Sequence, residues 1–179
     1  MRDQNGQIVI SHDCPENQDL PTFEELLVLY QKYQKTRPLA LNVKADGLQE
    51  KCRDLLVEYK IDLENIFFFD MSVPDALNYL KYQLPCFSRY SDEEPVPSFL
   101  DRATGVWIDG FETDCVSQEV LLDFLAGGHR LCLVSPELHK RKHQEVWGEW
   151  REMLKHHLKS VMICTDFPDL AYGFFNDEN

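Results

Sequence analysis

Short apolar runs without polar alternation recur along the chain, and this pattern is typical of strands buried on both faces of a sheet. Helical periodicity fills most of the segments between them. The predicted strands are residues 7–11, 39–43, 66–69, 86–87, 105–108, 131–134 and 161–164. Predicted helices are marked by a capping box at Thr22 and Glu25, an apolar stripe over 48–59, N-caps at Ser72 and Ser117, and a stripe over 146–154. The alternation predicts parallel βα units.

The number of units limits the architecture. A series of βα units closes into a barrel at eight strands, and such barrels usually need at least about 200 residues. At 179 residues, the chain is predicted to be one domain, residues 1–179. It is either an open doubly wound sheet or a barrel that lacks its beginning. The first predicted strand is not followed by a glycine-rich phosphate loop, so the nucleotide-binding open sheet loses its usual support.

Charge and cysteine usage narrow the classes of function. The chain has 18 Lys and Arg against 31 Asp and Glu, a formal charge of −13, which disfavours nucleic acid as a partner. The acidic residues are scattered, as on a solvated surface. Six cysteines without metal-binding spacing are predicted to be buried thiols. The sequence has neither an apolar run of about 18 residues nor an export signal, which predicts a cytoplasmic protein without a transmembrane segment.

Polar side chains follow the predicted strands, where a parallel barrel places its reacting groups. They are predicted to converge on one polar pocket, although each alone could equally be a helix cap or a loop residue. The set is His12, Asp13, Asn42, Lys44, Asp70, Ser72, Ser88, Arg89, Asp109, Glu112, Ser135, Glu137, His139, Thr165 and Asp166.

Three members of this set suggest phosphate chemistry. An imidazole such as that of His12 can protonate a departing alkoxide near neutral pH. Lys44 and Arg89 offer positive charge for a phosphate. The alternative for the two cations is an ion pair with a carboxylate, for which the candidates are Asp70, Asp109 and Glu137. The acidic members could hold Mg²⁺ or Ca²⁺ through oxygen ligands, but their spacing does not identify which ones.

An ordered series of motifs resembles the glycerophosphodiester phosphodiesterase family over nearly the whole chain. NGQIVISHD resembles that family's turn, strand and His-Asp, and LPTFEELL resembles the helix start that follows. LALNVKADGL stands where the family has a strand of the LNIEIK kind, and CTDFPDLA resembles its closing TDxP strand. FFFDMSVPDALNYL, GVWIDGFE and LCLVSPELHKR are similar to a bacterial subgroup of phosphatidylinositol phosphodiesterase-like barrels.

The resemblance implies an α/β fold, an incomplete (β/α)8 TIM barrel that lacks its first two strands. It implies a phosphoric diester hydrolase that acts on glycerophosphodiesters or phosphoinositide-like lipids by metal-assisted general acid-base catalysis. The implied catalytic acid is His12. Phosphate contacts are expected from Lys44, Arg89, Ser135 and His139, and contacts to a divalent cation, Mg²⁺ or Ca²⁺, from Asp13, Asn42, Asp109 and Glu137.

The chain departs from the family pattern in two places. The family's opening HRG motif and ExD acidic pair, which supply a second histidine and metal ligands, have no counterpart in these residues. We therefore expect the chain to begin after them. Asn42 also replaces a metal-binding glutamate, whereas Lys44 keeps the lysine position. Weak or no turnover is expected from these 179 residues alone.

Two alternatives stay open. The chain could be a non-catalytic, partner-dependent remnant of such a barrel, whose open sheet edges would be covered by a homo-oligomer or an upstream segment. Barrels also support glycosidase chemistry, for which Asp109, Glu112 or Glu137 would supply the carboxylate pair.

Overall fold

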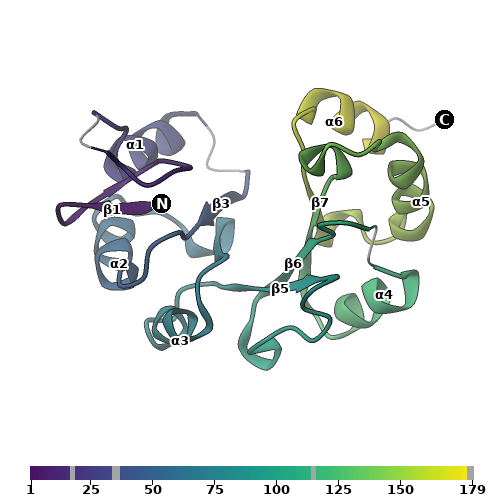
Figure 1. Cartoon of the computed structure of the whole chain (residues 1–179), viewed down its shortest axis with the longest axis horizontal. Coiled ribbons are helices and arrows are strands. Elements are labelled where there is room, and N and C mark those ends of the chain that lie inside the picture. Colours follow the sequence, from purple (N-terminus) through teal and green to yellow (C-terminus); the bar gives the residue numbers. More distant parts are fainter. Residues whose placement is uncertain (17–18, 34–36, 114–115, 177–179) are drawn as a thin grey trace. The chain divides into compact units, whose positions relative to one another are not determined.

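The computed structural model describes residues 1–16, 19–33, 37–113 and 116–176 and has an α/β fold (Figure 1). The chain divides into two compact units, Met1–Phe87 and Ser88–Asn179. Each unit is described by itself.

The first unit opens with an antiparallel hairpin. β1 (Arg2–Gln4) pairs with β2 (Gln7–Val9). The turn residues Asn5 and Gly6 both have positive φ, 55° and 82°, which is the conformation of a two-residue hairpin turn. The predicted strand over residues 7–11 is therefore confirmed over Gln7–Val9. It pairs antiparallel with β1 and not as a parallel barrel strand, because the Asn-Gly turn directs the chain back beside itself.

A parallel strand pair and three helices form the rest of this unit. β3 (Leu39–Asn42) pairs with β4 (Ile66–Phe69), whose side chains are all buried. The helices are α1 (Phe23–Tyr33), α2 (Gln49–Glu58) and α3 (Val73–Lys81). The predicted capping box is confirmed, since the amide of Thr22 donates to the Glu25 carboxylate at 2.8 Å and the amide of Glu25 donates to the Thr22 hydroxyl at 3.1 Å.

A four-stranded sheet organises the second unit. Its strand order is β5 (Phe87–Ser91), β6 (Gly105–Asp109), β7 (Arg130–Val134) and β8 (Val161–Cys164). β6, β7 and β8 run parallel, with Val106 opposite Leu131 and Leu131 opposite Val161. The helices are α4 (Gln118–Ala126), α5 (Gln144–Leu154) and α6 (Pro168–Asn176).

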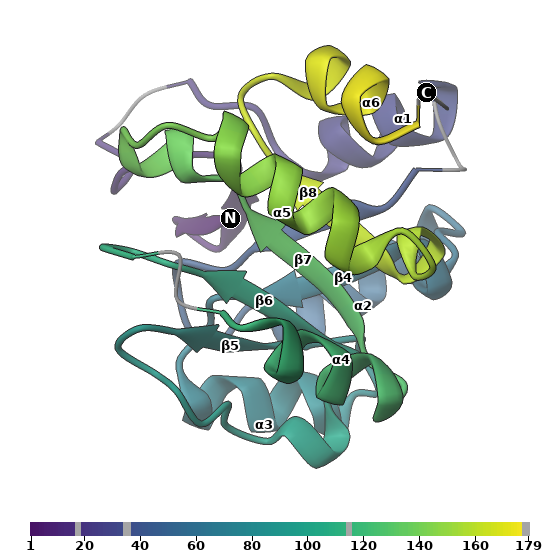
Figure 2. The same cartoon turned by 90° about the vertical axis from the view of Figure 1, so that its right-hand side faces the viewer.

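The core of the second unit lies between the sheet and its helices. Figure 2 shows α4 and α5 over one face of the strands. Alternate residues of the strands point into this layer because successive side chains of a strand face opposite ways. The fully buried members include Val106, Leu131 and Leu133 from the strands and Leu121 from α4. This packing fixes the strands, and hence the positions of the polar groups at their carboxyl ends.

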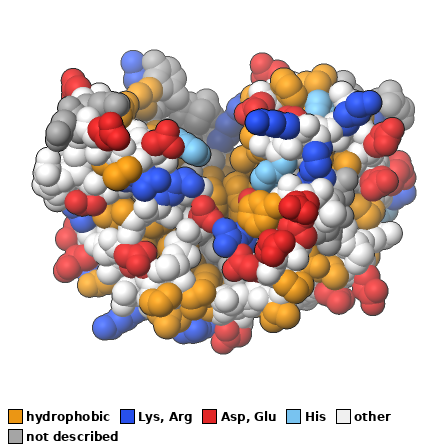
Figure 3. All heavy atoms as spheres, in the orientation of Figure 1, with side chains coloured by type: hydrophobic (Ala, Val, Ile, Leu, Met, Phe, Trp, Pro, Cys, Tyr) orange, Lys and Arg blue, Asp and Glu red, His pale blue; other side chains and the backbone are white. Residues whose placement is uncertain are grey.

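Most predicted elements are confirmed, including the strands over 66–69 and 161–164 at their predicted bounds. α6 was not predicted from periodicity. Within the described residues, no helix is long and apolar enough to cross a membrane. Acidic side chains are dispersed over the face drawn in Figure 3 rather than gathered in one patch.

Candidate functional site

The carboxyl ends of the strands in the second unit carry most of the predicted site residues. Asp109 ends β6. A short 3₁₀ helix, η3 (Pro136–His139), follows β7 and contains Glu137 and His139. Thr165 follows β8 directly. Parallel neighbours place these groups along one edge of the sheet.

Asp109 and His139 form a close pair. Nε2 of His139 lies 2.6 Å from Oδ1 of Asp109, and the indole N–H of Trp107 donates to Oδ2 at 3.3 Å. The side chain of His139 is 25% exposed and that of Asp109 is 15% exposed. A carboxylate that holds one ring nitrogen orients the imidazole and determines which nitrogen is left for other partners. This pair can therefore present Nδ1 of His139 for a hydrogen bond or a proton transfer.

Glu137 connects the ends of β7 and β8 with the start of α5. Oε2 accepts a hydrogen bond from the hydroxyl of Ser135, and Oε1 accepts one from the hydroxyl of Thr165. The amide of Asp166 also donates to Oε1 at 3.2 Å. Nδ1 of His143 lies 3.7 Å from Oε2. With 10% of its side chain exposed, Glu137 is an internal acceptor for the donors of Ser135, Thr165 and Asp166.

These donors determine the charge state of Glu137. Burial alone would raise its pKa, but hydrogen bonds from Ser135, Thr165 and two backbone amides outweigh burial and lower the pKa below its ordinary value of 4.5. Glu137 is therefore ionised at neutral pH. The buried hydroxyl of Ser135 also accepts the indole N–H of Trp147 at 2.8 Å, so both partners of this hydroxyl are internal. A phosphate contact for Ser135 stays a prediction.

His143 was missed in the sequence because it precedes an apolar stripe in a segment rich in charged residues. It lies at the N-terminal end of α5 with 7% of its surface exposed. Its ring packs 4.3 Å from that of Trp147 and 5.3 Å from that of Phe167, measured between centroids. The apolar residues that follow, Val146, Trp147 and Trp150, could have indicated that a histidine at this boundary would be buried.

Arg89 on β5 is paired within its own unit. Its guanidinium forms an ion pair with Glu94 and lies 5.8 Å from the ring centroid of Phe111. The same ring stands edge-on to His139 at 5.7 Å. Two residues predicted to contact phosphate therefore meet one aromatic side chain. An ion pair was the predicted alternative for Arg89, and the structure shows one; its partner Glu94 was not among the predicted candidates.

In the first unit, Lys44 and Asn42 both face Asp70. Nζ of Lys44 lies 3.8 Å from Oδ2 of Asp70, and the amide of Asn42 donates to the same oxygen at 3.4 Å. Oδ1 of Asn42 is buried and has no hydrogen-bond partner among the described residues. For Lys44, the structure shows the predicted ion pair with Asp70.

His12 and Asp13 lie at the surface of the first unit. Their side chains are 87% and 91% exposed, and Nδ1 of His12 lies 2.9 Å from Oδ1 of Asp13. The guanidinium of Arg2 donates to the backbone oxygens of His12, at 2.9 Å, and of Lys44, at 3.1 Å. Arg2 therefore connects the backbone segments that carry the predicted residues His12 and Lys44.

The predicted cation ligands show little spare coordinating capacity. Among the described residues, no group of three or more His, Cys, Asp and Glu side chains is arranged to hold a metal ion. Both carboxylate oxygens of Asp109 and of Glu137 are engaged in the hydrogen bonds given above. Asp13 and Asn42 belong to the first unit. These residues do not fit a metal site as arranged, and the divalent cation stays a prediction.

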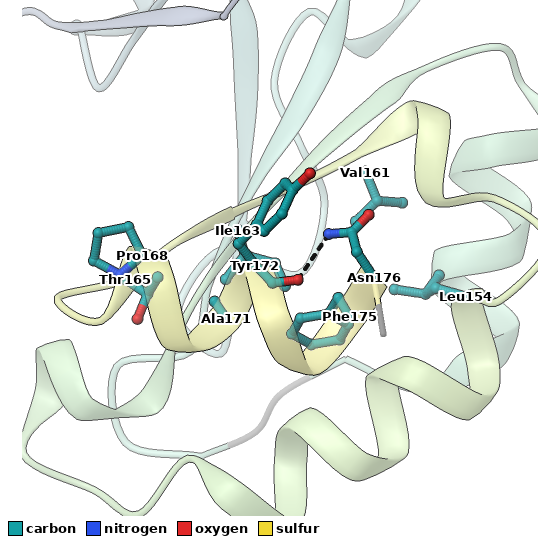
Figure 4. Close-up of a pocket in the computed structure, with 9 residues that line it drawn as sticks. All are labelled: Leu154, Val161, Ile163, Thr165, Pro168, Ala171, Tyr172, Phe175 and Asn176. Atoms are coloured by element: carbon teal, nitrogen blue, oxygen red, sulfur yellow. Dashed lines mark hydrogen bonds between the residues drawn. The ribbon is translucent and has the colours of Figure 1, made fainter. Parts of the chain in front are cut away.

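An apolar pocket lies between β8 and α6, with a volume of about 270 Å³. Figure 4 shows its lining, in which Asn176 donates to the backbone oxygen of Tyr172 at 2.9 Å. Thr165, a donor to Glu137, is the lining residue that connects this pocket with the polar strand ends. The lining is Leu154, Val161, Ile163, Thr165, Pro168, Ala171, Tyr172, Phe175 and Asn176.

Comparison with known proteins gives a structural relationship but no match in sequence. No family model matches the chain, and no curated protein matches its sequence. The fold is similar to that of a solved protein from Galdieria sulphuraria described as a putative glycerophosphodiester phosphodiesterase. The TM-score is 0.67 at 16% sequence identity, over 92% of this chain and 67% of the other. At this identity the similarity concerns the fold alone.

Proposed function

We propose that the chain is part of a barrel-type phosphoric diester hydrolase, with substrates of the glycerophosphodiester or phosphoinositide-like class. The observation that carries this proposal is the Asp109–His139 pair at the carboxyl ends of neighbouring parallel strands. The fold supports the proposal because it is similar to that of the Galdieria sulphuraria protein described as a putative glycerophosphodiester phosphodiesterase. The motifs shared with the glycerophosphodiester phosphodiesterase family point in the same direction.

In the proposed reaction, water or a neighbouring substrate hydroxyl attacks the phosphorus atom. Nδ1 of His139 takes the proton of that oxygen while Asp109 stabilises the resulting imidazolium. The bond between phosphorus and the alcohol oxygen breaks, and the departing alkoxide takes a proton from solvent, to which the imidazolium of His139 then releases its proton. Arg89 would exchange Glu94 for a non-bridging phosphate oxygen. No step depends on a metal.

The test compares hydrolysis by the wild-type chain and a His139→Gln variant. Glycerophosphocholine and bis(4-nitrophenyl) phosphate serve as substrates, and alcohol or nitrophenol release is measured. We expect slow turnover by the wild-type chain. Loss of a general acid-base group typically costs about 10² to 10⁴ in rate, so the turnover rate of the variant should be at least about 10²-fold lower. His156→Gln is the matched control because His156 is exposed and lies outside the site.

Asp109→Asn tests the orienting role separately. It keeps the shape of the side chain but removes the charge that stabilises the imidazolium, so kcat should decrease by about tenfold or more and KM should change little. Equal turnover in wild type, His139→Gln and Asp109→Asn would refute the catalytic assignment.

A second candidate is a phosphodiester-binding protein without turnover. It is favoured by the engagement of the Asp109 and Glu137 oxygens in internal hydrogen bonds. A homo-oligomer belongs to this candidate, since β5 and β8 are the outer strands of the sheet in the second unit and open edges favour strand pairing. Phosphodiester binding without hydrolysis, with a dimer in size-exclusion chromatography, is its expected signature.

A further inference from the structure

An acidic segment follows β5 and contacts the loop that follows β6. The segment contains Asp92, Glu93 and Glu94 and is flanked by Ser91 and Pro95. The Ser91 hydroxyl accepts hydrogen bonds from the amides of Glu93 and Glu94, at 3.2 and 2.9 Å, which holds the segment in a tight turn. The carboxylates of Asp92 and Glu94 are thereby presented to neighbouring donors.

The carboxylate of Asp92 lies in a cradle of consecutive backbone amides. The amide of Phe111 donates to Oδ1 at 3.0 Å, and the amides of Glu112 and Thr113 donate to Oδ2 at 2.8 and 3.1 Å. These hydrogen bonds, that from Glu112 first, lower the pKa of Asp92 to about 2. Successive amides that point to one spot form an anion-binding cradle, as in many phosphate sites.

The carboxylate of Glu94 is held by a cationic donor, the guanidinium of Arg89. This guanidinium also lies 5.8 Å from the ring centroid of Phe111, a residue of the amide cradle. The loop that follows β6 is held in place by Arg141, which donates to the backbone oxygen of Gly110 at 2.6 Å. The acidic segment therefore engages both the amide cradle and Arg89 on β5.

We propose that the amides of residues 111–113, together with Arg89, form a binding site for phosphate oxygens, and that Asp92 and Glu94 occupy this site in the resting chain. Carboxylate and phosphate oxygens are both anionic acceptors for the same donors. The ring of Phe111 stands edge-on to that of His139, 5.7 Å away between centroids, and His139 belongs to the pair proposed for catalysis. The acidic segment is then an autoinhibitory contact that a phosphoryl group must displace.

This inference rests on the proposed function for the class of ligand, and its test needs no turnover. Inorganic phosphate is titrated into the wild-type chain and into the double variant Asp92→Ala with Glu94→Gln, at constant ionic strength, by isothermal titration calorimetry. We expect the double variant to bind phosphate at least about tenfold more tightly, because two competing charge-assisted contacts have been removed. Amide resonances of residues 111–113 should shift during the titration.

The matched control is Glu93→Gln with Asp101→Asn, which removes the same formal charge from two exposed carboxylates that are not assigned to the anion site. It should leave phosphate affinity near the wild-type value. Adding Arg89→Gln to the Asp92→Ala, Glu94→Gln variant should abolish the gain. Should that double variant fail to fold, Glu94→Gln alone is compared with Glu93→Gln, and it should still bind phosphate more tightly. An equal gain in variant and control, or no gain in either comparison, overturns the proposal.

The two proposals fail separately. Tighter phosphate binding in the double variant without hydrolysis of any diester would keep the anion site and refute the hydrolase. Hydrolysis that depends on His139, with unchanged phosphate affinity on removal of Asp92 and Glu94, would keep the hydrolase and refute the autoinhibitory contact.

Discussion

Replacing Glu137 by alanine is the most direct test of how the strand ends are held together. The substitution removes the acceptor of the Ser135 and Thr165 hydroxyls and of the Asp166 amide. A hydrogen bond to a charged group contributes about 1.5 to 3 kcal/mol, and water can replace only part of this at a side chain 10% exposed. We therefore expect Glu137→Ala to lower the free energy of unfolding by about 3 kcal/mol.

The assay is urea unfolding followed by tryptophan fluorescence. Trp107, Trp147 and Trp150 are the tryptophans of the chain, and all belong to the second unit, so the signal reports on the unit that contains Glu137. Glu149→Ala on α5 is a matched control. Surface substitutions of this kind usually change the free energy of unfolding by less than about 0.5 kcal/mol.

The pH dependence gives a second measurement on Glu137. Its pKa is lowered in the folded chain below the ordinary 4.5, so the carboxylate adds stability above that pH and loses this contribution as pH falls through the folded pKa. Between about pH 5 and pH 3, Glu137→Gln should lose stability less steeply than wild type. An alanine variant within about 0.5 kcal/mol of wild type, or parallel pH profiles, would refute the role given to this carboxylate.

Two further predictions concern thiols and metal ions. Burial raises the pKa of Cys132 and raises that of Cys164 to about 11, so iodoacetamide should label the exposed Cys14 before Cys132 and Cys164, as followed by mass spectrometry; equal labelling of Cys132 in the folded chain would contradict this. Excess Mg²⁺ or Ca²⁺ should change Tm by less than about 1 °C, because the oxygens of Asp109 and Glu137 are already engaged. A rise of several degrees in differential scanning calorimetry would return these two residues to the predicted metal role.

The sequence predicts most of the sheet and helices because each depends on a local pattern. The unbroken apolar run at 66–69 identifies β4, which is buried on both faces, and the Thr22 capping box marks the start of α1. α6 was harder to identify. Its buried residue is the small Ala171, while the larger Leu170 and Tyr172 are exposed, so its large apolar side chains do not mark the face that packs.

The sequence predicts where the residues of the candidate site lie along the strands, but it does not predict their hydrogen-bond and ion-pair partners. The order of strands places Asp109, Glu137 and His139 at strand ends, and residues that far apart in sequence meet only in the folded sheet. Whether a carboxylate there binds a ligand depends on how many donors it already has. Nothing local to Glu94 indicates that it pairs with Arg89, or that Asp92 receives the amides of a loop about 20 residues away.

Burial and the nature of the existing donors distinguish the carboxylate of Glu137 from that of Asp92. Glu137 is nearly enclosed and receives hydroxyl and amide donors from residues fixed by the sheet, so releasing it would leave buried donors without partners, at a cost of about 1 to 3 kcal/mol each. Asp92 lies near the surface, and its donors would be met equally well by an incoming phosphate. An anionic ligand that reaches this edge should therefore displace Asp92 and Glu94 while Glu137 keeps its partners.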